Sequence, residues 1–327
     1  MRVFFLALGL ALLVYLTLRL GVAQILESVV RIRWGYLPLL GIFAAYQITR
    51  AAALAQTGLT AGIPFRSLVW TQLSGQAVQT LTFSGPFLAE PTRAWVLKQR
   101  GVTAGDAFAG VIAEYLVNTF VSAACSIVAL VWIRNHYALP PSVHTGAGII
   151  IVVMTIFLTT SAVAIVFRIY LLGSIVAAAR RVPIVGRRLR IDPGAMRKME
   201  DRLLFVLRDR PAQFLRTAAV DTLALTLLIA EAWWILRALN VAAGLSTAAL
   251  LEGATKFISV AFFFIPGQVG AAEGTYAVAC GALGLPPAAG VAFAFVRRLR
   301  TLAVAGAGLL ALSWAGRPDP AIAPDPR

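Results

Sequence analysis

Six long apolar stretches, each with the length of a membrane-spanning helix, most constrain how this chain can fold. A helix needs about 20 predominantly apolar residues to cross the hydrocarbon core of a bilayer. The chain is 59% apolar and only 13% charged, whereas soluble domains are about 25% charged. We therefore expect an all-α, polytopic integral membrane protein. The six expected spans are residues 3–20, 35–53, 106–133, 146–170, 214–238 and 287–314.

The first of these stretches has two interpretations. Arg2 precedes the apolar run, as in a secretory signal peptide, but the residues from Arg19 to Gln24 lack the small-x-small pattern of a cleavage site. We expect a retained helix, and a cleaved signal peptide is the alternative.

Two further apolar stretches, residues 67–92 and 246–283, are interrupted by glycine and proline. The first contains Ser84-Gly85-Pro86, and the second contains Pro266-Gly267 followed by Gly270. Non-helical backbone at membrane depth is tolerated only where it is buried in protein or lines a watery cavity. We expect both stretches to be broken or re-entrant helices.

The two broken stretches correspond to each other when the chain is shifted along itself so that Glu90 falls on Glu273. Ala89-Glu90-Pro91-Thr92-Arg93-Ala94 then falls on Ala272-Glu273-Gly274-Thr275-Tyr276-Ala277, and the following spans also coincide. The predicted repeat halves are residues 67–133 and 246–314. Three expected crossings separate them, so the second half would be inverted, an arrangement typical of transporters. Chance similarity in an Ala- and Gly-rich chain is the alternative.

The basic residues predict the orientation of the chain. There are 29 Lys and Arg residues against 14 Asp and Glu residues, a net charge of +15. If both termini are cytoplasmic, most of the basic residues fall on the inner side, as the positive-inside rule requires. Many of them lie in one loop, residues 174–213, where interleaved apolar residues favour interfacial helices against anionic headgroups over binding of nucleic acid. Residues 1–316 form one expected transmembrane domain, and the Pro-rich tail, residues 317–327, is expected to be disordered.

Several charged residues lie inside the apolar stretches, where an unpaired charge is costly. Glu252 and Lys256 are one helical turn apart and can pair on one helix face. Glu114 and Arg297 are equivalent under the same shift and have opposite charges, so we expect them to face each other across a pseudo-twofold axis. Glu90 and Glu273 lie next to the helix breaks, where they would line a cavity or cap a helix N-terminus.

The other intramembrane charges have less specific interpretations. Asp221 and Glu231 lie nearer the ends of an expected span, which favours structural or headgroup-exposed positions. Arg298 and Arg300 would snorkel toward the membrane surface or pair inside the protein.

Motifs of enzyme chemistry are absent from the sequence. It has no Asp-rich diphosphate motif, HExxH, GxSxG or P-loop. His136 and His144 lie in a short loop, and Cys125 and Cys280 lie in apolar runs, so no metal site is expected. We therefore expect no catalytic residues, no cofactor and no ATP-driven activity of this chain alone.

Two short blocks carry a family resemblance. The residues from Phe264 to Gly274, with Ala282 to Pro286 and Arg297 to Arg300, resemble the C-terminal signature of the lysylphosphatidylglycerol synthase transmembrane-region, or flippase-like, family. Gly85 to Arg93, with the segment from Lys98 to Glu114, is similar to the N-terminal signature of that family.

The resemblance implies a multi-pass lipid translocase of the bacterial or archaeal cytoplasmic (inner) membrane. Bifunctional members move aminoacylated phosphatidylglycerol between leaflets, and some stand-alone relatives accompany hopanoid, other lipid or glycolipid pathways. The residues that it assigns to the substrate cavity are Glu90, Arg93, Glu114, Gly267, Gly270, Glu273 and Arg297, to which we add Glu252 and Lys256 as secondary candidates.

Two departures from the family pattern bear on the substrate. Gly85-Pro86 is reversed, Phe87 replaces a basic residue and Ala89 a glycine, and Ala272 stands where arginine is common. Fewer cations favour a headgroup other than aminoacyl-phosphatidylglycerol. Only a short tail follows Trp314, so we expect a stand-alone protein without the aminoacyl-transferring domain.

The sequence thus favours translocation of a lipid or lipid-linked molecule between leaflets through a polar cavity at the interface of an inverted repeat. The partners expected are a membrane lipid as substrate and anionic headgroups at the basic loop, with a lipid-synthesis enzyme or a second copy of the chain as further compatible partners. Two alternatives remain open, namely a non-catalytic scaffold in a lipid or glycolipid biosynthesis complex and a membrane-embedded transferase acting on a lipid carrier.

Overall fold

The computed structural model describes residues 32–82, 85–169, 193–256 and 270–315, and within these ranges all regular structure is helical. Among these residues, four helices are long and apolar enough to cross a membrane. They are α3 (Tyr36–Gln56), α6 (Ala104–His136), α7 (Pro141–Val166) and α11 (Pro211–Ala238). The expected span at residues 3–20 lies outside the described ranges.

These helices agree closely with four of the expected spans, and α15 (Pro287–Ala315) agrees with the span expected at residues 287–314. The largest difference is in α7, which begins at Pro141, before the predicted start at residue 146. Proline at the first helical position lacks only an N–H that has no partner there in any case, so it starts a helix well.

Among the described residues, each apolar stretch with helix-breaking residues contains two shorter helices. The first forms α4 (Phe65–Leu81) and α5 (Gly85–Gln99), with extended backbone at Thr82 between them. The second forms α12 (Leu245–Thr255) and α14 (Ala271–Ala282). The expected break between α4 and α5 is therefore confirmed, and α14 begins directly after Gly270, whereas the break expected at Pro266 lies outside the described residues. Gly267, a predicted site residue, lies outside the described residues.

The predicted basic loop is helical where the structure describes it. Helix α10 (Pro193–Leu204) begins at a proline and continues into a π-helical turn, η2 (Phe205–Asp209). Its apolar face, with Met199 and Leu203, packs on α6, and Arg202 forms an ion pair with Asp106 at the start of α6. This part of the loop is therefore held against the helix bundle through its apolar face.

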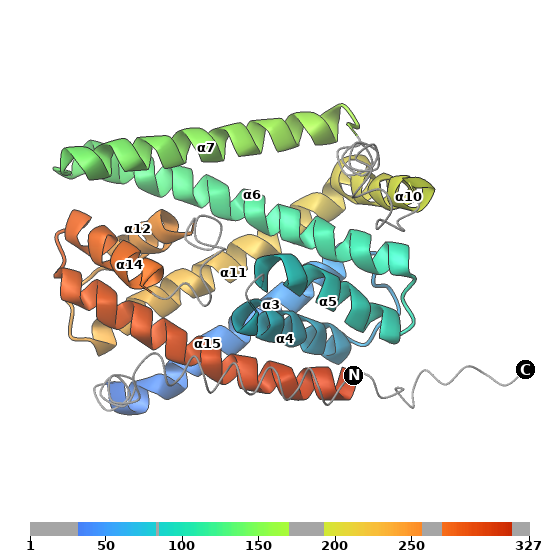
Figure 1. Ribbon diagram of the computed structural model, residues 1–327, viewed down its shortest axis with the longest axis horizontal. Coiled ribbons are helices and arrows are strands. Elements are labelled where there is room, and N and C mark those ends of the chain that lie inside the picture. The colour runs from blue at the N-terminus through green and yellow to red at the C-terminus, as the bar shows by residue number, and fades with distance from the viewer. Residues whose placement is uncertain (1–31, 83–84, 170–192, 257–269, 316–327) are drawn as a thin grey trace, which may run out of the picture.

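The two long helices α6 and α15 enclose the short helices between them (Figure 1). The pair α4 and α5 lies toward one end of this space and the pair α12 and α14 toward the other. Each pair contacts both long helices, because α4 packs on α15 and α5 on α6, while α12 packs on α6 and α14 on α15. Helices α3 and α11 pack along each other, and a short 3-10 turn, η1 (Arg33–Gly35), precedes α3.

Small residues allow the closest of these approaches. A Cβ atom on Gly308 of α15 would collide with the Leu73 carbonyl and the Ala77 side chain of α4. A Cβ atom on Gly253 of α12 would collide with Ala129 of α6 in the same way. Membrane helices associate largely through such tight packing, because lipid tails are as apolar as the side chains themselves.

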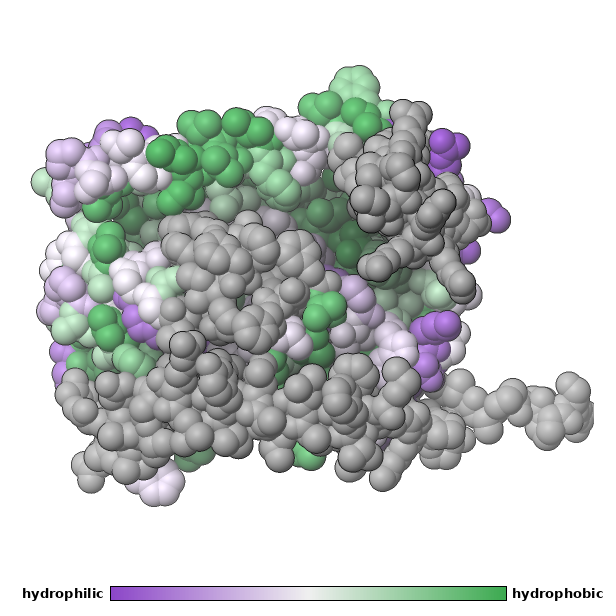
Figure 2. Space-filling view, viewed as in Figure 1, coloured by the Kyte–Doolittle hydropathy of each residue, from purple (hydrophilic) through white to green (hydrophobic). Residues whose placement is uncertain are grey.

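Helix α7 leaves most of its surface uncovered by the other described residues. Figure 2 shows hydrophobic side chains over α7, along the upper edge of the view. In water such a surface would be unfavourable, whereas in a bilayer it faces lipid. Its exposed apolar residues include Ile149, Val152, Val153, Ile156, Phe157 and Val163.

Candidate functional site

Five buried charged residues from four helices form the first charged cluster, which we define as Arg50, Glu90, Arg93, Glu114 and Asp221. The Arg50 Nε atom on α3 lies 2.6 Å from Glu114 Oε1 on α6 and 3.8 Å from Asp221 Oδ1 on α11. Glu114 and Asp221 have no exposed surface. The cluster therefore joins three long helices through one guanidinium group.

The short helix α5 contributes the remaining pair of the first charged cluster. Glu90 and Arg93 lie on the same face of this helix, and Arg93 Nη1 donates to the two carboxylate oxygens of Glu90 at 2.7 and 3.0 Å. The Arg93 side chain lies against Gly75 of α4, where any Cβ atom would collide with it. Glu90 also interacts electrostatically with Glu114 and Arg50.

A second charged cluster lies at the other broken stretch, and we define it as Glu231, Glu252, Lys256, Arg297 and Arg300. Glu252 accepts from Lys256 at 2.8 Å within one helical turn, which confirms the predicted pair, and from Arg297 Nη2 at 2.6 Å. Glu231 of α11 forms ion pairs with Arg297, at 3.4 Å, and with Arg300. Both acids are almost completely buried.

Glu273 both caps α14 and forms an ion pair. Its Oε2 atom accepts from the Gly270 backbone N–H at 2.8 Å, and its Oε1 atom lies 2.5 Å from Arg298 Nη1. Gly270 has a φ angle of 83°, a conformation that glycine adopts without steric cost. The capping interpretation of Glu273 is thus confirmed, and Gly270 is the residue that starts the helix.

A polar cavity of about 220 Å³ lies beside the second charged cluster. Residues from six helices line this cavity, so the cavity is formed by the packing of the helices against one another. Its charged lining is Glu252, Lys256, Arg297 and Arg300, and its uncharged polar lining is Tyr46, Gln76, Gln79, Thr255 and Tyr276. Tyr46 also interacts electrostatically with Arg50, which places the first charged cluster next to this cavity.

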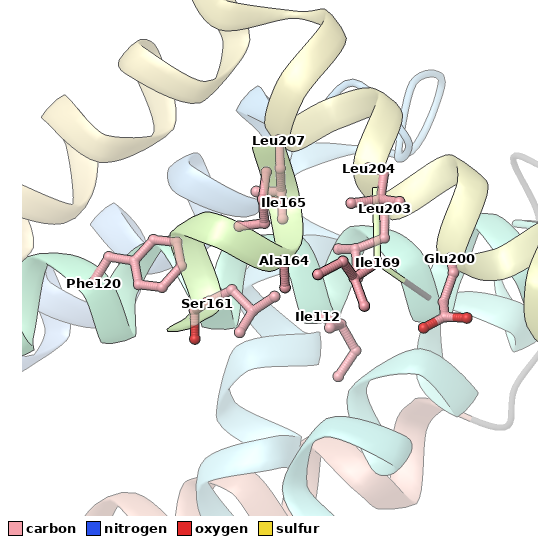
Figure 3. A pocket seen from close by; sticks show the side chains of 11 residues that line it. Ile112, Phe120, Ser161, Ala164, Ile165, Ile169, Glu200, Leu203, Leu204 and Leu207 are labelled. Atoms are coloured by element: carbon pink, nitrogen blue, oxygen red, sulfur yellow. The ribbon is translucent and has the colours of Figure 1, made fainter. Parts of the chain in front are cut away.

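A second cavity, of about 200 Å³, is almost entirely apolar. It lies between α6, α7, α10 and η2, and Figure 3 shows Phe120 toward one end, Glu200 at the other and aliphatic side chains between them. None of the predicted site residues lines it. Its chemistry suits a hydrocarbon group, in contrast to the polar cavity.

The predicted pairing of Glu114 with Arg297 is wrong. Glu114 pairs with Arg50 and Arg297 pairs with Glu252 and Glu231. The physical reason is the packing of neighbouring helices: α3 packs on α6, and α11 packs on α15, so each charge has a partner on an adjacent helix. Equivalent positions in two predicted repeat halves do not imply contact.

Three further buried charged residues were not identified from the sequence as members of the site. Asp221 and Glu231 were expected to be structural or exposed to headgroups, and of these two alternatives exposure to headgroups is wrong, because both residues have no exposed surface and belong to the charged clusters. Arg50 was not among the predicted site residues, yet it lies within α3 and is buried. The sequence does contain a signal that Arg50 lies inside the helix. The residues from Ala51 to Ala55 are all apolar and continue the helix beyond Arg50, and α3 ends at Gln56.

The described residues contain no group of His, Cys, Asp and Glu side chains that could hold a metal ion. Cys125 and Cys280 are free thiols. The chemistry that the two charged clusters and the polar cavity offer is therefore recognition of a polar or charged group inside an apolar bundle.

The chain matches the family described as "Lysylphosphatidylglycerol synthase TM region" over residues 3–308. Since the match covers most of the 327 residues, the chain belongs to this family, as the two short sequence blocks indicated. No curated protein matches the chain, and no solved structure matches it. Family membership and the apolar helices make it a multi-pass membrane protein with a lipid-related function.

Proposed function

We propose that this member of the lysylphosphatidylglycerol synthase transmembrane-region family moves a lipid or lipid-linked molecule between the leaflets of the bacterial or archaeal cytoplasmic membrane. The observation that carries the proposal is the polar cavity, since three cations, one acid and five uncharged polar side chains line a space inside a bundle of largely apolar helices. A lipid headgroup is costly to place in hydrocarbon, and a polar path through the protein removes that cost. The tails would stay in the bilayer. The protein would act without a catalytic residue or a cofactor.

The charge of the lining favours an anionic headgroup. Lys256, Arg297 and Arg300 line the polar cavity together with one acid, Glu252, and Glu231 lies behind the two arginines. Arginine matches the geometry of a phosphate group through paired N–H donors. A phosphodiester would therefore exchange with the carboxylates as the partner of Arg297 and Arg300.

An inverted repeat would let this cavity open to either side of the membrane. The order of long, short, short and long helices in α3 to α6 recurs among the described helices from α11 to α15. Gly253 of α12 lies in tight contact with Cys125 of α6, and Gly308 of α15 lies in a corresponding tight contact with Leu73 of α4. The shift that places Glu90 on Glu273 also places Cys125 on Gly308, and it brings Leu73 to within one helical turn of Gly253. Both matches support a pseudo-twofold relation between the halves.

The ion pairs support the same relation with the charges exchanged. Arg50 of α3 pairs with Glu114 of α6, and Glu231 of α11 pairs with Arg297 of α15. The same shift places Glu114 on Arg297 and brings Arg50 to within one helical turn of Glu231. In this arrangement six full crossings and two broken stretches leave both termini in the cytoplasm. Rocking of one half against the other would expose the cavity alternately.

Purified protein in proteoliposomes tests the proposal directly. Fluorescent phosphatidylglycerol is placed in both leaflets, and a membrane-impermeant reductant quenches the outer leaflet. Wild type is expected to make the inner-leaflet fluorophore accessible. Arg297→Gln should slow this by at least about tenfold, equivalent to ~1.4 kcal/mol of lost interaction. Arg216→Gln, which changes an exposed arginine of α11, should have the wild-type rate.

Two results would overturn the proposal. If wild type leaves the inner fluorophore protected with every lipid tried, a scaffold in a lipid-synthesis complex replaces the translocase. If the lipid is converted chemically during the assay, a transferase replaces it. Equal elution of both variants in size-exclusion chromatography controls for folding. Glu90→Gln should also reduce the rate, because it removes the carboxylate that holds Arg93.

A further inference from the structure

The first charged cluster contains one more acid than it has bases. Glu90, Glu114 and Asp221 face only Arg50 and Arg93, and each of the five residues is less than a tenth exposed. Among the described residues, the polar interactions of these five are with one another and with Asn118, Tyr46 and Tyr115, and Gln72 donates to the backbone carbonyl of Arg50. If all three acids were ionised, a net charge of −1 would be buried inside the bundle.

The geometry shows which acid lacks a cation of its own. Glu90 accepts two hydrogen bonds from Arg93, and Glu114 holds the Arg50 Nε atom at 2.6 Å. Asp221 is 3.8 Å from that nitrogen, and its Oδ1 atom accepts a long bond from Asn118 at 3.4 Å. Its Oδ2 atom is buried and, among the described residues, has no hydrogen-bond partner.

We propose that Asp221 binds a proton on Oδ2, and that this site couples lipid movement to a proton gradient. A buried carboxylate without a partner is strongly unfavourable, and binding a proton removes the charge. The step adds one proton from water to one carboxylate oxygen and forms one O–H bond. It requires no other reactant.

The groups around Asp221 can be assigned element by element. Arg50 on α3 and Glu114 and Asn118 on α6 contact it or interact with it electrostatically. Glu90 and Arg93 on α5 are linked to Asp221 through Arg50 and Glu114, with which Glu90 interacts electrostatically. The charges of α12 and α15 pair within the second charged cluster or with Glu273. On η2, Asp209 pairs with Arg168 and Arg208 is exposed.

The site is connected to the polar cavity through one tyrosine. Tyr46 lines that cavity and interacts electrostatically with Arg50. If Arg50 turned toward a headgroup in the cavity, Glu114 would lose its cation and the whole cluster would bind protons more tightly. Release of the headgroup would restore the Arg50–Glu114 pair and free the proton. This coupling rests on the proposed function, whereas protonation of Asp221 does not.

Infrared spectroscopy tests the proton site without any transport. We expect the wild-type protein in lipid nanodiscs at neutral pH to show the carbonyl stretch of a protonated carboxyl group. Asp221→Asn, which keeps the shape of the side chain, should lose this band. Asp209→Asn removes a partly exposed acid that is paired with Arg168 and should retain it.

If wild type at neutral pH shows no carbonyl band of a protonated carboxyl group, the proposed proton site is overturned. A band that survives in Asp221→Asn and disappears in Glu114→Gln would overturn the assignment to Asp221. Dependence of the band on sodium concentration would also count against it, since a metal ion would then occupy the position of the proton.

Proteoliposomes with an imposed pH gradient test the coupling. Lipid movement by wild type should depend on the gradient, and movement by Asp221→Asn should lose that dependence. If wild type moves lipid at a rate that the gradient does not change, the coupling is overturned while the proposed function stands. If wild type moves no lipid but shows the infrared band, the proposed function fails and the proton site stands.

Discussion

At the scale of single residues, Arg50 is the cation on which the first charged cluster depends. Its guanidinium group is the nearest partner of Glu114, and both side chains are buried between α3 and α6. A buried ion pair contributes little over a well-packed apolar pair, but removal of one partner leaves an uncompensated charge. The two partners should therefore be strongly coupled in stability.

Arg50→Met should lower the free energy of unfolding by about 3–5 kcal/mol, because Glu114 loses its cation inside the bundle. The double variant Arg50→Met with Glu114→Gln should recover most of that loss, since no buried charge remains at the pair. Titration of detergent-solubilised protein with a denaturing detergent measures both values. Additive effects of the two single changes would show that the pair is not coupled.

At the scale of helices, the fold depends on glycines that let helices touch, and two of them join a short helix to a long helix distant in sequence. Gly308 of α15 lies directly on the backbone of α4, and Gly253 of α12 lies on α6. These contacts hold α4 against α15 and α12 against α6. The polar cavity lies between elements that these contacts hold in place, since α4, α12 and α15 all line it.

Gly308→Ala should destabilise the protein by about 1–3 kcal/mol, because the added methyl group overlaps the Leu73 carbonyl and backbone must move. Gly306, on the same helix, provides the matched control. A Cβ atom there meets nothing within 4 Å, so Gly306→Ala should be neutral or stabilise by up to ~1 kcal/mol. Thermal unfolding followed by size-exclusion chromatography measures the difference. Equal stability of the two variants would contradict the close contact.

At the scale of the whole molecule, the lengths of the apolar stretches and the positions of helix-breaking residues were sufficient to predict most of the described helices. The ends of α6, α11 and α15 agree with the sequence to within a few residues, because hydrophobic length and Pro or Gly boundaries are local properties. The site was predicted only in part. Glu252 and Lys256 were found because their pairing is local.

Arg50, Asp221 and Glu231 were not predicted as site residues because their partners come from other helices. Arg50 on α3 meets Glu114 on α6, and Glu231 on α11 meets Arg297 on α15. Contacts of this kind depend on which helices pack together and on their rotation. A single sequence contains the charges but not that packing, which is why Glu114 and Arg297 were paired with each other.

The same whole-molecule arrangement predicts which exposed surfaces water reaches. Val153 of α7 is 57% exposed in the isolated protein, but it belongs to an apolar surface that should face lipid tails. Gln79 of α4 is only partly exposed and lines the polar cavity. In a background where Cys125 and Cys280 are replaced by alanine, a small charged thiol reagent should modify Gln79→Cys in proteoliposomes and leave Val153→Cys unmodified. After the membrane is dissolved in a denaturing detergent, both should react. Rapid modification of Val153→Cys in intact membranes would place α7 against water or a water-filled interface and contradict this arrangement of the bundle in the bilayer.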